Sequence, residues 1–246
     1  MARQERKLNI VFILIQTVLY FSFLVLDLKG SSIALSSAIK YSVIILCFCY
    51  ALFLGKGADK SILNIMRAAF LFTLISDLFL LILDYYFFGL LTFNIVQLLY
   101  QIRISHSIYK GCSKKWELIL KRVMLLLFLQ SVMTLMICAF LTVLGVALEG
   151  LLIVSVLYFL GILTNTVGAV RLAAIKPRNS VQISFAIGMV LFLLCDINVG
   201  LFNLSGFISL SHGIAELVYS LSSVLMWTFY APSQVMLALS ISKESS

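Results

Sequence analysis

Apolar runs long enough to cross a lipid bilayer follow one another along nearly the whole of this chain. A membrane-spanning helix needs about 17 to 25 mostly apolar residues, and the 246-residue sequence divides into about eight such runs with short connections. Charged residues make up only 11% of the chain, against about 25% in an average soluble domain. We therefore predict an all-α, polytopic membrane protein in which residues 1–246 form a single transmembrane domain.

Glycine, proline and charged residues separate the apolar runs, as expected for turns between helices. The predicted spans are 8–27, 33–54, 66–84, 88–104, 118–145, 150–172, 181–203 and 217–241. The first run follows a basic segment and superficially resembles a signal peptide. It is too long for one, and residues 27–30 offer no small-residue cleavage site. We expect it to be retained as the first helix.

The loop charges predict the orientation of the bundle. Eight spans place alternate loops on opposite sides of the membrane, and Lys and Arg concentrate in cytoplasmic loops. The side that holds both termini carries every one of the 18 Lys and Arg residues except Lys29 and Lys40. We therefore predict cytoplasmic termini, and in a prokaryote the cytoplasmic membrane. The net charge of +8 then reflects topology, and no nucleic-acid partner is expected.

Cysteines and histidines show no pattern typical of a metal site. The five cysteines lack the spacing of a zinc site or of a disulfide framework. His106 and His212 fall in different predicted loops, which also argues against a zinc hydrolase of the ceramidase type and against a Ser/His/Asp triad. We expect no metal and no cofactor.

Three ionisable residues stand out because they lie well inside predicted spans, where an unpaired charge is costly and is often functional. Lys40 lies about seven residues into the second span, roughly 10 Å at the helical rise. Asp77 and Asp196 each precede the outer end of their own span by a similar number of residues. All three are therefore expected at one depth, in the outer half of the bilayer.

Two interpretations of this trio stay open. The three residues either line one polar cavity shared by the second, third and seventh spans, or form a structural Lys–Asp pair beside a hydrogen-bonded carboxylate. Other polar residues are expected at nearby depths: Tyr20, Asn94, Gln97, Tyr100, Asn198 and Tyr230. Any one of them is more typical of contacts between helices. Asp27, Asp84 and Glu216 fall at outer span ends, where we expect them to face water.

The two halves of the chain carry a weak internal similarity. Residues 71–77 (Leu-Phe-Thr-Leu-Ile-Ser-Asp) resemble residues 190–196 (Val-Leu-Phe-Leu-Leu-Cys-Asp), and each Asp is followed at the same separation by a tyrosine, Tyr100 or Tyr219. This pattern indicates a four-plus-four parallel repeat, an arrangement also found in transporters.

Several short motifs together resemble the YhhN family, which includes the lysoplasmalogenases and has eight predicted spans. The motifs are Lys40, residues 76–80 (Ser-Asp-Leu-Phe-Leu), 93–100 (Phe-Asn-Ile-Val-Gln-Leu-Leu-Tyr), 192–196 (Phe-Leu-Leu-Cys-Asp), 229–230 (Phe-Tyr) and 233–234 (Ser-Gln). The resemblance covers most of the chain. It departs from the family pattern where Gln97 replaces a His, Tyr41 a Pro, Cys195 a Gly or Ser, and Ser233 an Ala.

The resemblance implies hydrolysis of the vinyl ether bond of a lysoplasmalogen, which releases a fatty aldehyde and a glycerophospho-base. Such a reaction needs one carboxyl group that donates a proton and one that stabilises the resulting cation and directs water, as in glycoside hydrolysis. Asp77 and Asp196 are the catalytic candidates. The substrate-binding candidates are Lys40, Asn94, Gln97, Tyr100, Tyr230 and Gln234. The change to Gln97 removes any proton-shuttling His at that position.

Non-enzymatic functions fit the same residues. A small transporter, lipid-binding protein or sensor would use buried Lys and Asp residues to bind an ion, a proton or an amphiphile. A structural membrane subunit would tolerate joint replacement of Lys40, Asp77 and Asp196 by apolar residues. Membrane lipids, including a lysophospholipid substrate, are the expected partners. The sequence sets neither the oligomeric state nor the leaflet from which a substrate enters.

Overall fold

Eight α-helices make up the described part of the computed structural model, which covers the chain apart from residues 1, 31, 55–58, 204–211 and 242–246. They are α1 (Ala2–Leu28), α2 (Ile33–Leu54), α3 (Lys60–Leu81), α4 (Tyr86–Ile108), α5 (Lys115–Val143), α6 (Gly150–Ile175), α7 (Ser180–Phe202) and α8 (His212–Leu239). Each is long and apolar enough to cross a membrane. The predicted all-α fold with eight spans is therefore confirmed.

Several predicted helix ends differ from the structure by three residues or more, including the start of the eighth helix, which begins at His212 and not at residue 217. The third helix begins at Lys60, because the Asp59 side chain accepts a hydrogen bond from the Ser61 amide and caps the helix there. It ends at Leu81, and Asp84 lies in the following turn with φ 55°. The fourth helix continues to Ile108, because its last polar residues face the bundle interior and are shielded from water.

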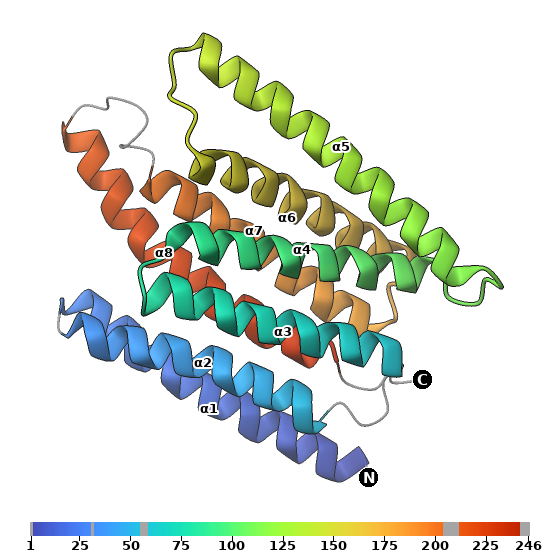
Figure 1. The fold of residues 1–246 in the computed structure, drawn as a ribbon. Coiled ribbons are helices and arrows are strands. Elements are labelled where there is room, and N and C mark those ends of the chain that lie inside the picture. Colours follow the sequence, from blue (N-terminus) through green and yellow to red (C-terminus); the bar gives the residue numbers. More distant parts are fainter. Residues whose placement is uncertain (1, 31, 55–58, 204–211, 242–246) are drawn as a thin grey trace.

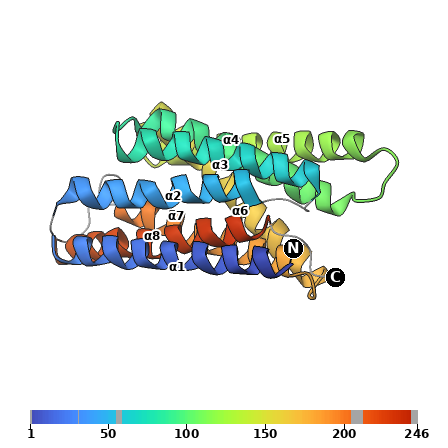
Figure 2. The same ribbon diagram turned by 90° about the horizontal axis from the view of Figure 1, so that it is seen from below.

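The helices run up and down the bundle in turn, so that both described ends of the chain lie at one end of the molecule (Figure 1). We call this the terminal end and the opposite one the distal end. The distal end holds the connections α1–α2, α3–α4, α5–α6 and α7–α8. Figure 2 shows α3 and α4 along one side of the bundle and α1 and α8 along the other. The cytoplasmic location of the terminal end stays a prediction.

The helix contacts support the predicted four-plus-four repeat. Among the described residues, each closely packed pair in one half has a counterpart in the other: α1·α2 with α5·α6, α2·α3 with α6·α7, and α3·α4 with α7·α8. The pairs that join the halves also correspond, α4·α6 with α2·α8 and α4·α5 with α1·α8. The tyrosine part of the repeat differs between the halves, because Tyr100 is fully buried whereas Tyr219 is 53% exposed.

Glycines allow close approach in both matching hairpins. A Cβ on Gly89 of α4 would lie 2.5 Å from Leu80 Cδ2 of α3. A Cβ on Gly188 of α7 would lie 2.8 Å from Leu237 Cγ of α8. Small residues at such crossings let helix backbones pack closely where no hydrophobic effect drives association.

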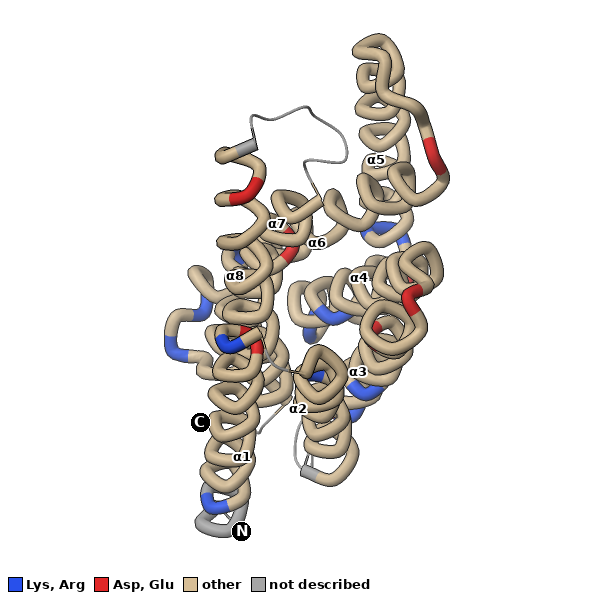
Figure 3. The backbone as a smooth tube through the Cα atoms, turned by 90° about the vertical axis from the view of Figure 1, so that its left-hand side faces the viewer, with Lys and Arg blue, Asp and Glu red and all other residues tan. Residues whose placement is uncertain are grey.

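One core cluster of buried apolar side chains draws on the described parts of α1–α4 and α6–α8. Helix α5 packs outside this cluster, against α4 and α6, and diverges from α6 toward the distal end (Figure 1). Figure 3 shows how few Lys, Arg, Asp and Glu residues lie along the helices. The outward faces carry large exposed apolar side chains, as a surface against lipid requires.

The end of α4 holds two buried basic residues. By the sequence prediction, Arg103, in the span 88–104, belongs to the charges of the terminal side, and His106 lies in a loop. His106 is fully buried, its ring centroid 5.9 Å from that of Trp116, so the prediction of a loop position is wrong. Arg103 is also buried: Nη2 donates to the Ser240 carbonyl at 3.1 Å, and Cζ lies 3.6 Å from the Phe185 ring centroid. Residue His212 begins α8 rather than lying in a loop.

Candidate functional site

Asp77 of α3 is held by a tyrosine from the other half of the chain. The Tyr230 hydroxyl of α8 donates a hydrogen bond to Asp77 Oδ2 at 2.6 Å, and both side chains are buried. A buried carboxyl group needs such a partner, because desolvation without a hydrogen bond is costly. Tyr230 thereby fixes the position of this carboxyl group inside the bundle.

Asp196 of α7 has a matching arrangement with a different helix. The Tyr158 hydroxyl of α6 donates a hydrogen bond to Asp196 Oδ2 at 2.7 Å. Tyr158 is buried, whereas Asp196 is only partly buried. Both candidate carboxyl groups therefore accept a hydrogen bond from a buried tyrosine of a neighbouring helix.

A continuous run of aromatic rings connects the two tyrosines. The Tyr230 ring centroid lies 5.6 Å from that of Phe192, which lies 5.8 Å from that of Phe93. The Phe93 centroid is in turn 5.7 Å from that of Tyr158. The contacts are tilted or edge-to-face, and such contacts at these separations are favourable. The two carboxyl–tyrosine pairs thus belong to one aromatic core that joins α4, α6, α7 and α8.

Cys195 directly precedes Asp196 on α7, and its side chain is buried. The two acids, on α3 and α7, are connected through the aromatic rings that join their tyrosine partners.

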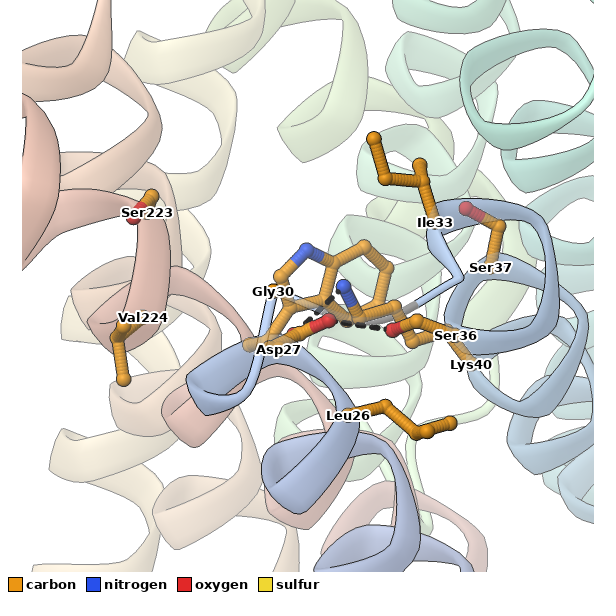
Figure 4. A pocket seen from close by; sticks show the side chains of 10 residues that line it. Leu26, Asp27, Gly30, Ile33, Ser36, Ser37, Lys40, Ser223 and Val224 are labelled. Carbon is orange, nitrogen blue, oxygen red and sulfur yellow. Dashed lines mark hydrogen bonds and ion pairs between the residues drawn. The ribbon is translucent and has the colours of Figure 1, made fainter.

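Lys40 forms its ion pair with an acid that we expected to face water. Lys40 Nζ lies 2.8 Å from Asp27 Oδ2, and the Ser36 hydroxyl donates to the other oxygen of Asp27. Figure 4 shows Asp27, at the end of α1, pointing toward Ser36 and Lys40 of α2. The prediction that Asp27 is simply solvated is wrong, because the α1–α2 turn brings it against Lys40. Asp84 and Glu216 are exposed as predicted.

The Lys40–Asp27 ion pair lines a cavity of about 270 Å³ at the distal end. Helices α1, α2 and α8 form its walls, with Ser223 and Val224 across the space from Asp27 (Figure 4). Trp227 of α8 also lines it, and its ring centroid lies 4.5 Å from Lys40 Nζ and 5.4 Å from the Tyr230 ring centroid. Trp227 therefore connects the cavity to the tyrosine that holds Asp77.

Two further candidates from the sequence lie on α4, facing α6. Asn94 Nδ2 donates to the Leu90 carbonyl at 3.0 Å and reaches the Val154 carbonyl at 3.4 Å. Gln97 Oε1 accepts from Asn165 Nδ2 at 2.9 Å, and Gln97 Nε2 is buried with no partner among the described residues. Gln97 thus occupies the interior, but its carbonyl oxygen is already engaged.

Tyr100 and Gln234, the last two candidates, are fully buried. The Tyr100 ring packs against Phe185, with centroids 5.7 Å apart. Gln234 Nε2 lies 3.4 Å from Ser233 Oγ, and Gln234 Oε1 has no hydrogen-bond partner among the described residues. Buried polar groups without partners are uncommon in proteins, so these side chains retain capacity to bind a polar ligand or water.

Sequence reasoning did not select Tyr158, Asn165, Trp227 or Asp27. Tyr158 and Asn165 lie in a strongly apolar span that carries no ionisable group before its terminal end, so neither stood out. Asp27 had one available signal: a carboxylate at the end of one predicted span precedes Lys40 of the next by a short turn. Two helices joined by a short turn must have their joined ends close together in space. Asp27 could therefore have been expected near the start of the next helix.

Comparison with known protein families identifies the chain. The YhhN family model matches residues 35–241, which is most of the sequence. The chain belongs to the YhhN family. Membership agrees with the resemblance of the motifs around Asp77 and Asp196, both of which lie within the matched range. YhhN is a lysoplasmalogenase-type family. Neither curated proteins nor solved structures gave a match.

Proposed function

We propose that this YhhN protein is an integral membrane hydrolase that cleaves the vinyl ether bond of lysoplasmalogen-type lysophospholipids. The observation that carries the proposal is the pair of carboxyl groups, Asp77 and Asp196, each held by a tyrosine hydroxyl in one aromatic core. Family membership supports the reaction class. The lipid-facing exterior supports a substrate that reaches the protein from the bilayer.

The reaction requires four proton transfers and one water molecule. One carboxyl group donates its proton to the outer carbon of the C=C–O unit, and the adjacent carbon becomes an oxocarbenium ion. The second group, as carboxylate, stabilises this cation and takes a proton from the water that attacks it. When the resulting hemiacetal breaks its C–O bond to the glycerol oxygen, the second group returns a proton to that oxygen, which leaves as an alcohol. The first group takes the proton of the hemiacetal hydroxyl, so a fatty aldehyde remains and both carboxyl groups regain their starting states.

The two tyrosines position the carboxyl groups for these steps. A hydrogen bond to one oxygen of each acid fixes its orientation, and a fixed orientation lowers the entropic cost of reaching the transition state. The aromatic rings next to the two tyrosines present π-electron faces that can stabilise the oxocarbenium ion. Both acids are therefore needed in one catalytic cycle, one as proton donor and one as base.

The decisive experiment measures aldehyde release from lysoplasmalogen by the purified full-length protein. Asp77→Asn and Asp196→Asn should each reduce the rate by at least about 10²-fold, the contribution typical of general acid–base catalysis. An ester lysolipid should yield no fatty acid. Asp84→Asn, at an exposed acid outside the core, is the matched control and should retain full activity. Full activity in either core variant contradicts the proposal.

Transport is the second candidate, and the symmetry of the helix contacts favours it. Both halves pack their helices in corresponding pairs, as in transporters built from parallel repeats. A transporter would bind or move a lysolipid without forming aldehyde. Vesicles that contain the protein and lysoplasmalogen therefore separate the two functions, because only hydrolysis consumes the vinyl ether bond.

A further inference from the structure

We propose that the cavity between α1, α2 and α8 binds the zwitterionic headgroup of a single-chain phospholipid, with Asp27 holding its ammonium group and Lys40 its phosphate. This inference rests on the proposed function, because it assigns a headgroup site for the same lipid substrate. Three features of the cavity carry it: its size, its paired charges and its position relative to Asp77.

The size of the cavity suits a headgroup rather than a whole lipid. Pockets for small-molecule ligands usually enclose about 300–1,000 Å³, and this cavity encloses about 270 Å³. Its walls also carry polar groups on two sides: the Asp27, Ser36 and Lys40 side chains on one and the Ser223 hydroxyl on α8 on the other. A phosphate ester with a short amine fits such a space. The acyl or alkenyl chain of the lipid would instead lie against the apolar helix surfaces outside the cavity.

The paired charges select a zwitterion. Lys40 and Asp27 neutralise each other at 2.8 Å, and their side chains are 10% and 23% exposed. A ligand that parts them must give each a new partner, because an uncompensated charge at a partly buried position is costly. A zwitterion supplies an ammonium for Asp27 and a phosphate for Lys40. An anionic headgroup would supply only the second and leave Asp27 without a counter-ion.

Neighbouring groups strengthen both halves of this site. The Ser36 hydroxyl, hydrogen-bonded to Asp27, orients the carboxylate. The Trp227 ring lies against the Lys40 ammonium and lines the same cavity, so it can contact a ligand ammonium once Lys40 turns to the phosphate. Aromatic faces are the usual recognition element for alkylammonium groups.

The position of the cavity directs the lipid toward Asp77. Trp227 precedes Tyr230 by three residues on α8, a rise of about 4.5 Å along the helix, and their ring centroids are 5.4 Å apart. In a lysoplasmalogen the phosphate and the vinyl ether lie at opposite ends of the glycerol unit. A headgroup held at Lys40 therefore brings the vinyl ether bond toward Tyr230 and its partner Asp77.

A binding experiment can use the cavity's own tryptophan. The chain has two tryptophans, so Trp116→Phe leaves Trp227 as the only one. This protein, in detergent, is titrated with two alkyl-ether lysolipids of equal chain length, one with a phosphoethanolamine and one with a phosphoglycerol headgroup. Neither carries a vinyl bond. The Trp227 emission should saturate for the ethanolamine lipid at a concentration at least about tenfold lower, a difference of about 1.4 kcal/mol.

Variants test the assigned charges. Asp27→Asn in the same background should bring the two affinities within about twofold of each other, because the ammonium loses its counter-ion. Asp84→Asn is the matched control at another distal-end acid, and Asn tolerates its positive φ; it should keep the preference. Ser36→Ala is a milder second variant that should weaken ethanolamine-lipid binding by removing the hydrogen bond that orients Asp27.

Each outcome bears on one proposal alone. Equal affinities in the Trp116→Phe protein, or an unchanged preference in Asp27→Asn, overturn the headgroup site even if aldehyde is released. The expected preference without any aldehyde from lysoplasmalogen supports the headgroup site and overturns the hydrolase. The comparison of the two lipids needs no variant at Asp27, so a folding defect in Asp27→Asn leaves the test decisive.

Discussion

The Tyr230 hydroxyl and the Asp77 carboxyl group, 153 positions apart in the sequence, are joined by a 2.6 Å hydrogen bond between α8 and α3. Tyr230→Phe removes this bond with little change in shape. We expect aldehyde release to fall about 10- to 100-fold, because Asp77 loses the contact that orients it. Tyr219→Phe, at an exposed tyrosine of the same helix, should leave the rate unchanged. Equal rates in both variants would remove Tyr230 from the mechanism.

Tyr158→Phe should have a comparable effect through Asp196, whose Oδ2 it contacts at 2.7 Å. If both acids serve one catalytic cycle, the double variant Tyr158→Phe/Tyr230→Phe should be less impaired than the product of the two single effects, since groups that act as a unit are not additive. The measurement is a double-mutant cycle: the rate constants of the parent, the two single variants and the double variant are compared. Strict multiplication of the effects would indicate that the two pairs act independently.

Gly188→Ala should destabilise the α7–α8 hairpin. The added Cβ would lie 2.8 Å from Leu237 Cγ and 3.1 Å from the Leu237 backbone nitrogen, which cannot move freely. We expect a loss of about 1–3 kcal/mol of unfolding free energy, as for overpacked cores, seen as a lower Tm in detergent. Gly200→Ala on the same helix is the control, because no described atom lies within 4 Å of its Cβ. A similar Tm for both variants would contradict this packing.

Arg103→Lys should also lower the Tm, although it keeps the positive charge. The guanidinium donates to the Ser240 carbonyl, and its Cζ lies 3.6 Å from the Phe185 ring centroid. Lysine can reproduce neither the fork of donors nor the contact of a planar cation with the ring. The expected loss is about 1–3 kcal/mol. Arg178→Lys, at an exposed residue, should stay within about 0.5 kcal/mol of the parent. An unchanged Tm in Arg103→Lys would show that the contacts of Arg103 with Ser240 and Phe185 do not contribute to the stability of the protein.

Thiol labelling tests the predicted orientation. Cys112, in the α4–α5 connection at the terminal end, is exposed. If this end is cytoplasmic, a membrane-impermeant maleimide added outside intact cells should not label it and should do so after permeabilisation. Lys29→Cys in a Cys112→Ser background places a thiol at the distal end and should show the reverse pattern. Labelling of Cys112 in intact cells would invert the assigned topology.

Much of the architecture was readable from the sequence because apolar runs of spanning length have few alternatives. In a bilayer the backbone must satisfy its own hydrogen bonds, so each run becomes a helix. The same reasoning found Asp77 and Asp196, since a charge inside such a run stands out. It placed His106 in a loop and did not predict the burial of Arg103, because a polar segment at the end of a run looks the same whether it continues into a loop or faces the bundle interior.

The partners of the charged residues were decided by tertiary structure. Equal depth suggested that Lys40 would pair with Asp77 or Asp196. Depth gives only the position of a residue along the membrane normal, however, and the rotation of each helix decides which neighbours its side chain contacts. The turn after α1 places Asp27 against Lys40, while Tyr230 of α8 reaches the buried Asp77 and Tyr158 of α6 reaches the partly buried Asp196. The sequence by itself determined eight apolar helices with an acid well inside two of them, Asp77 and Asp196, because desolvation constrains composition. Only the packing decided which hydroxyl or ammonium group contacts each acid. Such a contact depends on the rotation of each helix about its axis, and the sequence of a helix that is apolar on all sides does not indicate that rotation.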